Sequence, residues 1–466
     1  MPEVRLIYGP PGTGKTTELL RILDKELETT SPSNIAFVSF TREGVEQGKR
    51  RAKERYNLPE EAFPYFRTLH SMAFRANGLS VSSVIQKKDY AAFSKKVGMH
   101  FTGYYTEDFK NNDDMYLHYD TVYRNTPSAS EFFLDYLDAE KLRFVQKNFK
   151  LFKQHYGIYD YTDMIEKFVA AGKAVPVTVA MIDEAQDLTA LQWKMVWTAF
   201  SACRVVYIVG DDDQAIYEWS GADVSYFLSL EGENKILRQS YRVPNQVWKV
   251  ASYISAQIKN RVVKRYHSTE EEGTVDYSNT IDEISFEQDT SYMILSRNDY
   301  FLKTAIERLR QLGIVYKYKG KASINQNDIS LITKYEECRR TKELDPIVQA
   351  KMKKGATLEE PWYEALRFEE EYATYIRKVI SAKRDIKSVV VSTIHGVKGG
   401  EADHVILFTD VTKRTYQNLQ HNPDSEHRVF YVGVTRAKHR LTIIYPSTRY
   451  HYPIIDRKEL ETYVPD

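Results

Sequence analysis

Three glycines, a lysine and three threonines lie close together near the start of the chain, within the run LIYGPPGTGKTT at residues 6–17. Their spacing fits G-x-x-x-x-G-K-[ST], in which backbone N–H groups wrap around phosphate oxygens because the glycines leave no side chain in the way. The lysine then reaches the outer phosphates and the threonine hydroxyl holds Mg²⁺. The predicted phosphate-binding residues are Gly9, Pro10, Pro11, Gly12, Thr13, Gly14, Lys15, Thr16 and Thr17.

A pair of acidic residues follows a hydrophobic run later in the chain. Residues 175–182 predict a buried strand, and Asp183 and Glu184 come directly after it. At the carboxyl end of a parallel strand, these acids would lie beside the phosphate loop. Asp183 would then hold Mg²⁺, and Glu184 would orient and deprotonate an attacking water. The alternative, two solvated acids at a strand end, is disfavoured by the phosphate loop upstream.

A single segment later in the chain carries residues suited to two different ligands. Residues 205–209 predict another strand, which runs into Gln214 and then Trp219. A glutamine just past a strand end can report on the γ-phosphate, and a tryptophan further along can stack on a nucleobase. The segment would then contact both a nucleotide and a second partner, unless Trp219 only fills the core.

The elements around these residues alternate between strands and helices. The predicted strands cover residues 4–8, 35–39, 175–182, 205–209, 315–318, 388–392, 404–408 and 440–445, with a strand and turn over 291–298. Predicted helices cover residues 15–27 and 300–312, and another begins within 66–71. The alternation favours an α/β fold with parallel sheets. It disappears near residues 75–156 and 322–385, which predict mainly helical insertions.

Composition sets the wider limits. The chain has 466 residues, of which 42% are hydrophobic and 28% charged, as in ordinary globular proteins of two to four domains. The formal net charge of +1 provides no global attraction for nucleic acid, so a basic binding site must be local. Cys203 and Cys338 fit no metal spacing and no disulfide framework. We expect no membrane span, no signal peptide and a location in the cytoplasm of a bacterium or a phage-infected host cell.

An ordered series of motifs extends over nearly the whole chain. It reads GPPGTGKTT, SFTREG, TLHSMAF, DEAQDLTALQW, VGDDDQAIYEWSGAD, LRQSYRVP, STIHGVKGGEADHVIL and YVGVTRAKHRL. In order and content the series resembles the UvrD/Rep family of superfamily-one helicases. The resemblance implies two RecA-like P-loop NTPase lobes, each with a mainly helical accessory insertion.

The resemblance also implies roles for residues of the nucleotide site, with ATP and Mg²⁺ as cofactors. Lys15, Thr16, Asp183 and Glu184 keep the roles argued above, and Gln214 couples the γ-phosphate to movement. The family's arginine fingers correspond to Arg242 and Arg436, its adenine-stacking residue to Tyr241 and its ribose-binding residue to Glu401.

The implied partners are single-stranded DNA and junctions between single and double strands. The positions that line the single-strand path in the family correspond to Phe40, Thr41, Thr68, His70, Trp219, His395 and Lys398. The resemblance divides the chain into six parts. Lobe one would comprise residues 1–74 and 157–232, its insertion 75–156, lobe two residues 233–321 and 386–466, and its insertion 322–385.

Several positions depart from the family pattern. No glutamine-bearing segment precedes the phosphate loop, which puts base selectivity in doubt, and Ser220 stands where an arginine is usual. The second insertion is short, so a translocase that strips proteins from DNA but unwinds poorly is an alternative to a 3′-to-5′ helicase. A DNA-binding protein that uses ATP only as a switch is a second alternative. A small-molecule kinase is a third, but it has no use for Trp219 or for the block at 395–401.

Overall fold

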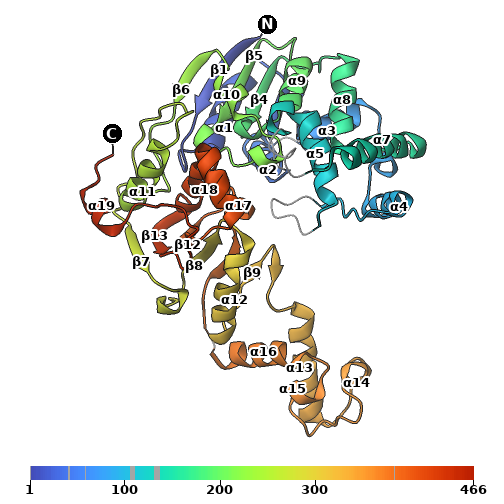
Figure 1. The fold of residues 1–466 in the computed structure, drawn as a ribbon, viewed down its shortest axis with the longest axis vertical. Helices are drawn as coiled ribbons and strands as arrows, with labels where there is room; N and C mark the ends of the chain where they lie inside the picture. Colours follow the sequence, from blue (N-terminus) through green and yellow to red (C-terminus); the bar gives the residue numbers. More distant parts are fainter. Residues whose placement is uncertain are drawn as a thin grey trace.

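Two parallel β-sheets dominate the computed structural model, which describes residues 2–39, 42–57, 59–104, 111–130, 137–382 and 384–465. The sheets belong to two successive lobes, with α17 (Lys413–His421) and α18 (Pro423–Val434) of the second lobe lying against the first (Figure 1). Together they form the two RecA-like lobes expected from the sequence. Among the described helices, none combines the length and apolar character that crossing a bilayer requires.

The first sheet has six strands, all parallel, in the order β3-β2-β4-β5-β1-β6. In chain order the strands are β1 (Glu3–Tyr8), β2 (Ile35–Ser39), β3 (Phe66–Arg67), β4 (Val179–Asp183), β5 (Val205–Gly210) and β6 (Glu233–Ile236). The strands β2, β4 and β5 are buried along their whole length. This explains their continuous hydrophobic sequences, because helices cover both faces of a parallel sheet.

Helices pack on both faces of this sheet. One face carries α1 (Lys15–Leu27) and α2 (Arg42–Tyr56), and the other carries α3 (Leu69–Ala76), α8 (Tyr161–Ala171) and α9 (Ala190–Ala199). Each face has its own hydrophobic core. The short helix α10 (Val224–Leu228) lies between β5 and β6 in the chain.

The second sheet has seven strands in the order β10-β9-β11-β8-β12-β13-β7, and only the β9–β10 pair is antiparallel. In chain order the strands are β7 (Thr274–Ser278), β8 (Ser291–Ser296), β9 (Lys317–Tyr318), β10 (Lys321–Ala322), β11 (Ser388–Thr393), β12 (Ala402–Phe408) and β13 (Ala437–Ile444). One face packs on α12 (Leu302–Gln311), and the other on α11 (Asn245–Ala256), α17 and α18. The last described helix is α19 (Arg457–Thr462).

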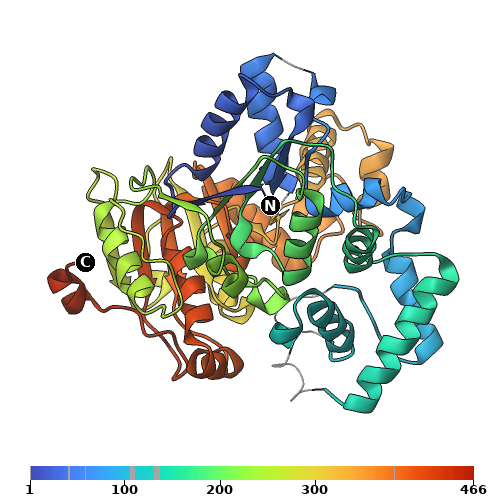
Figure 2. The same cartoon turned by 90° about the horizontal axis from the view of Figure 1, so that it is seen from above.

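The two helical insertions differ in how they are stabilised. The first contains α4 (Lys87–Val97), α5 (Asp114–Asn125) and α7 (Ala139–Tyr156), which enclose a separate aromatic core. These helices lie to one side of the molecule, apart from α1 and α2 (Figure 2). The second insertion extends away from both sheets (Figure 1), and its buried residues continue the core of the second lobe. Its helices are α13 (Gln326–Thr341), α14 (Pro346–Lys351), α15 (Trp362–Ala365) and α16 (Glu370–Ala382).

Three local predictions differ from the structure. The strand predicted over 175–182 begins only at Val179, because Pro176 has no N–H for a strand ladder. Residues 66–71 do not begin a helix directly, because Phe66 and Arg67 pair with β2 and the helix starts at Leu69. The strand β6 pairs with β1, so residues 233–236 belong to the first sheet and the predicted boundary at 233 lies too early in the chain.

Candidate functional site

The phosphate loop connects β1 to α1, as the sequence predicts. Gly12 and Gly14 have φ angles of 72° and 78°, a left-handed conformation that favours glycine. A Cβ on Gly12 would also lie 2.4 Å from Cβ of Arg242, so the glycine allows the second lobe to approach the loop. The Lys15 Nζ donates to the carbonyl oxygen of Gly9 at 2.8 Å. The start of α1 therefore faces the gap between the lobes with its backbone N–H groups available to an anion.

The two predicted carboxylates lie next to this loop. Asp183 ends β4 and is buried, and Glu184 follows it with a left-handed φ of 52°. Burial and the nearby Glu184 raise the pKa of Asp183 to about 7, although a hydrogen bond with Thr16 opposes the shift. Burial also acts to raise the pKa of Glu184, but the charges of Lys15 and Lys398 outweigh it and hold that pKa below its usual value.

The Thr16 hydroxyl and the Asp183 carboxylate are chemically suited to Mg²⁺. They are oxygen donors in contact with each other, and Asp183 is buried beside a second carboxylate, Glu184, whose charge acts to raise its pKa. Magnesium sites beside triphosphates use few protein ligands because phosphate oxygens and waters complete the octahedron. The residues present therefore fit the cation that the sequence implies.

A cavity of about 1010 Å³ separates the lobes at this point, and we call it the nucleotide cleft. The first lobe contributes residues of the phosphate loop, the two carboxylates and Gln214. The second lobe contributes the residues Arg242, Lys398, Gly399, Gly400, Glu401 and Arg436. The cleft thus brings together residues that are far apart in the sequence, from the phosphate loop to Arg436.

Two arginines of the second lobe lie in the cleft with different partners. The Arg242 Nε donates to Glu401 Oε2 at 2.6 Å. Arg436 is almost fully buried, and its Nη2 donates to Gln214 Oε1 at 3.0 Å. Burial, with a contribution from Arg242, lowers the pKa of Arg436 to about 9, so it stays charged at neutral pH. The predicted arginine finger and the predicted γ-phosphate sensor therefore meet across the lobes.

Lys398, which was predicted to line the single-strand path, lines the nucleotide cleft. Its Nζ donates to Asp187 Oδ1 at 2.7 Å and to the carbonyl oxygen of Gln214 at 2.7 Å. Burial raises the pKa of Asp187 to about 7, against the charge of Lys398. The prediction missed Asp187, although the third acidic residue of the DEAQD motif was a usable signal.

Tyr241 lies at the edge of the cleft. Its side chain is 78% exposed, and its backbone N–H donates to the carbonyl oxygen of Gly12 at 2.9 Å. A side cavity of about 300 Å³ separates the ring from the start of α1. The first-lobe side of this cavity includes Thr17 and Glu18. An aromatic face that is open to solvent beside the phosphate loop is suited to stacking on a nucleobase.

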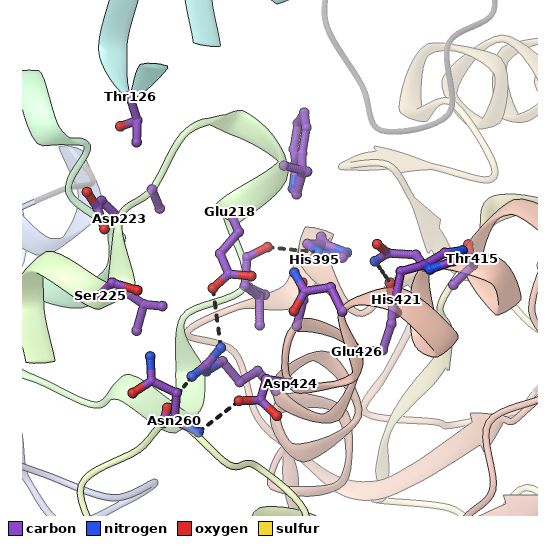
Figure 3. A pocket seen from close by; sticks show the side chains of 18 of the residues that line it. Thr126, Glu218, Asp223, Ser225, Asn260, His395, Thr415, His421, Asp424 and Glu426 are labelled. Atoms are coloured by element: carbon purple, nitrogen blue, oxygen red, sulfur yellow. Dashed lines mark hydrogen bonds and ion pairs between the residues drawn. The ribbon is translucent and has the colours of Figure 1, made fainter. Parts of the chain in front are cut away.

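A second cavity, of about 580 Å³, lies where the first insertion, the segment around Trp219 and helices α17 and α18 meet. We call it the Trp219 pocket. In Figure 3, Asp223 and Ser225 lie on one side and Thr415 and His421 on the other, with His395 between them. The pocket is therefore built from both lobes and from an insertion.

Trp219 is held between two histidines in this pocket. Its ring stacks on His118 with centroids 5.8 Å apart, and it meets His395 edge-on at 6.4 Å. Its buried indole N–H finds no acceptor among the described residues. Burial lowers the pKa of His118 to about 4, so this imidazole is neutral at pH 7. His118 was missed in the prediction because nothing in the insertion sequence marks it.

Thr68 and His70, also predicted for the single-strand path, do not line this pocket. Thr68 caps α3, since its hydroxyl accepts from the Ser71 N–H at 3.2 Å. His70 lies two residues further on and packs edge-on against Tyr161 at 5.4 Å, and burial lowers its pKa to about 4. Phe40 and Thr41 lie outside the described residues. Of the predicted residues that the structure describes, Trp219 and His395 line the Trp219 pocket.

Two RecA-like lobes with a phosphate loop, paired acids and opposing arginines define a two-lobed P-loop NTPase. The family model for the UvrD/REP helicase N-terminal domain matches residues 2–235, and that for the UvrD-like helicase C-terminal domain matches residues 388–444. The chain belongs to the UvrD/REP helicase family, as its motifs predict.

Curated relatives agree with this assignment. The ATP-dependent DNA helicase PcrA of Staphylococcus epidermidis is 24% identical over 279 residues, which cover 53% of this chain and 37% of that protein. PcrA of Staphylococcus aureus is 24% identical over 284 residues, 55% of this chain and 38% of its own length. The alignments thus span less than two fifths of these relatives. The alignment with a solved PRRSV helicase structure has 11% sequence identity and covers 97% of this chain and 55% of the PRRSV chain. Its TM-score is 0.34, which is too low to support an argument.

Proposed function

We propose that this chain is an ATP-dependent motor on single-stranded DNA and a DNA helicase that moves 3′ to 5′. The observation that carries the proposal is the path of the segment after β5. Gln214 contacts Arg436 in the nucleotide cleft, and Trp219, further along the same segment, stacks in the Trp219 pocket. A change at the γ-phosphate can therefore reach the DNA side through one short stretch of backbone.

The nucleotide cleft would bind ATP and hydrolyse it. The backbone of the phosphate loop and Lys15 would hold the phosphates, and Thr16 and Asp183 would hold Mg²⁺, which supplies charge neutralisation at the phosphate oxygens when bound. Glu184 is suited to orient a water and accept its proton, because its lowered pKa keeps the carboxylate ionised. Tyr241 would stack on the adenine and Glu401 would bind the ribose.

Movement would come from closure of the two lobes around ATP. Arg242 and Arg436 would be drawn toward the phosphates, so the bond between Arg242 and Glu401 would be exchanged for contacts with the nucleotide. A closed lobe pair with ATP and an open pair after release are the two states that differential contacts require. If each lobe grips the strand in turn, the cycle gives a directional step.

The Trp219 pocket would hold bases of the single strand. Trp219 and His395 offer ring faces and edges, and base stacking is worth about 1–3 kcal/mol per base with little dependence on sequence. Where the duplex is being separated, the same path would contact the junction between single-stranded and double-stranded DNA. Thr68, which caps α3, and His70, on that helix, would extend the path beyond the pocket.

Steady-state ATPase with and without single-stranded DNA tests this proposal, using the wild type beside Glu184→Gln. We expect strong stimulation by DNA in the wild type and a loss of about 10²–10⁴-fold in the variant, because the general base is removed. Glu54→Gln, an exposed residue of α2, is the matched control and should behave as the wild type. A wild-type rate that is indifferent to DNA would favour the ATP-switch alternative.

A translocase that removes bound proteins with little unwinding is the second candidate. The small size of the second insertion, which has only the short helices α14 and α15 between α13 and α16, favours it. Strand separation on a forked duplex under single-turnover conditions decides between the two, since efficient unwinding by the monomer excludes the translocase.

A further inference from the structure

Lys264 is a buried lysine whose charge the proposed function does not use. It follows α11 in the chain, yet its side chain is completely buried among three acidic residues that follow β5 of the first lobe. Its Nζ lies 2.5 Å from Asp212 Oδ1, 3.0 Å from Asp213 Oδ2 and 3.2 Å from Asp211 Oδ1. Burial acts to lower the pKa of Lys264, but the three carboxylates outweigh it and raise that pKa.

A continuous set of contacts leads from Lys264 to the nucleotide cleft. Asp211 Oδ1 faces Lys264, while Asp211 Oδ2 accepts from the Gln214 Nε2 at 2.6 Å. The other end of the same amide, Gln214 Oε1, accepts from Arg436 at 3.0 Å. Both ends of the Gln214 side chain are therefore fixed, one by a carboxylate and one by a guanidinium.

The direction of the Gln214 amide depends on the charge of Asp211. An ionised carboxylate only accepts hydrogen bonds, so it holds the NH₂ end of the amide and leaves the oxygen end for Arg436. Burial acts to raise the pKa of Asp211, but Lys264 is the largest opposing influence and that pKa is lowered overall. Without Lys264, Asp211 would be buried beside two further acidic residues, Asp212 and Asp213, with no lysine to balance their charge. Asp211 would then take up a proton. A protonated Asp211 can donate, and the amide could then turn its NH₂ end toward Arg436, where two donors would face each other.

We propose that Lys264 is a positioning residue for ATP hydrolysis: by keeping Asp211 ionised, it fixes the Gln214 amide with its oxygen toward Arg436. The inference rests on the proposed function, because it assigns Gln214 to the γ-phosphate. Lys264 does not line the nucleotide cleft, so it acts on the reaction only through Asp211 and Gln214.

A double-mutant cycle between Lys264→Met and Gln214→Ala, measured as DNA-stimulated ATPase, tests the proposal. In the wild-type background we expect Lys264→Met to lower kcat about tenfold and to leave KM for ATP within about twofold. In the Gln214→Ala background the same change should have no further effect on kcat, because its target is already gone. Equal losses in both backgrounds would overturn the proposal, as would a Gln214→Ala variant with wild-type kcat.

Arg261→Met is the matched control for loss of charge in this cluster. Arg261 Nε donates to Asp213 Oδ1 at 2.8 Å, and no described contact joins it to Asp211. Its effect on kcat should therefore be the same with and without Gln214. Thermal unfolding of every variant shows whether the fold is kept.

Asp211→Asn keeps the test decisive if Lys264→Met does not fold. It preserves the shape of the side chain and removes the charge, and it should reproduce the drop in kcat in the wild-type background alone. Wild-type protein without DNA-stimulated ATPase would refute the proposed function itself. If DNA stimulates the wild-type ATPase but the kcat losses of Lys264→Met and Gln214→Ala are additive, only the role of Lys264 is refuted.

Discussion

The nucleotide cleft and the Trp219 pocket both lie between the lobes, but they are built in different ways. The cleft is formed by glycines and charged side chains that follow strand ends in short motifs. The pocket combines the first insertion, the segment after β5 and helices α17 and α18. Two of its arginines are already bonded to carboxylates, since Arg297 contacts Glu426 at 2.6 Å and Arg428 contacts Glu218 at 3.2 Å.

The difference indicates what each region recognises. In the cleft, positive groups and backbone N–H groups converge on the space where phosphates would lie. In the pocket, Arg297 and Arg428 are paired with carboxylates and His118 is neutral at pH 7, so we expect ring faces to provide the main attraction. We therefore expect variants of the cleft to change chemistry and variants of the pocket to change the affinity for DNA.

The largest effect is expected for Arg436→Ala. An arginine finger is worth about 10³–10⁵ in rate, so kcat for ATP should fall by about 10³ while the affinity for single-stranded DNA stays within about twofold. Arg449→Ala, an exposed arginine of the same lobe, is the control. Steady-state ATPase and fluorescence anisotropy with a labelled oligonucleotide measure the two quantities. Parallel losses of kcat and of DNA affinity would show that the cleft and the pocket do not have separate functions.

Trp219→Ala should give the reverse pattern. Loss of a stacked base costs about 1–3 kcal/mol, so the DNA concentration for half-maximal stimulation should rise by about 5- to 150-fold. The kcat at saturating DNA should change much less. Trp219→Phe keeps an aromatic face and should recover part of the affinity. An unchanged DNA requirement in Trp219→Ala would show that the ring serves only the core.

The smallest effect is expected for the pH dependence of the Mg²⁺ requirement, which tests the electrostatics of the nucleotide cleft. Because the pKa of Asp183 is raised to about 7, its carboxyl is protonated below that pH and Mg²⁺ must displace the proton. The Mg²⁺ concentration for half-maximal ATPase should therefore rise by up to about tenfold per unit as pH falls below 7. Nucleotide binding measured without Mg²⁺ is the control and should vary less. A Mg²⁺ requirement that stays constant from about pH 8 to pH 6 would contradict this role.

Local sequence predicted much of the fold. The helix from Lys15 to Leu27 and the strand from Ile35 to Ser39 have the predicted bounds, because glycine-rich loops and buried parallel strands carry strong local signals. The strand β6 was assigned to the wrong lobe because its residues are mostly exposed and polar, and only its pairing with β1 places it in the first sheet.

The sequence by itself determined the phosphate loop and the two carboxylates of the nucleotide cleft, since each of these motifs carries its chemistry within a few positions of a strand end. Tertiary structure alone decided which distant side chains meet. Lys398 turns to Asp187, His118 reaches Trp219 from an insertion, and Lys264 crosses to the acids after β5. Such contacts depend on how lobes and insertions pack against one another, and the spacing of residues along one segment does not encode that packing.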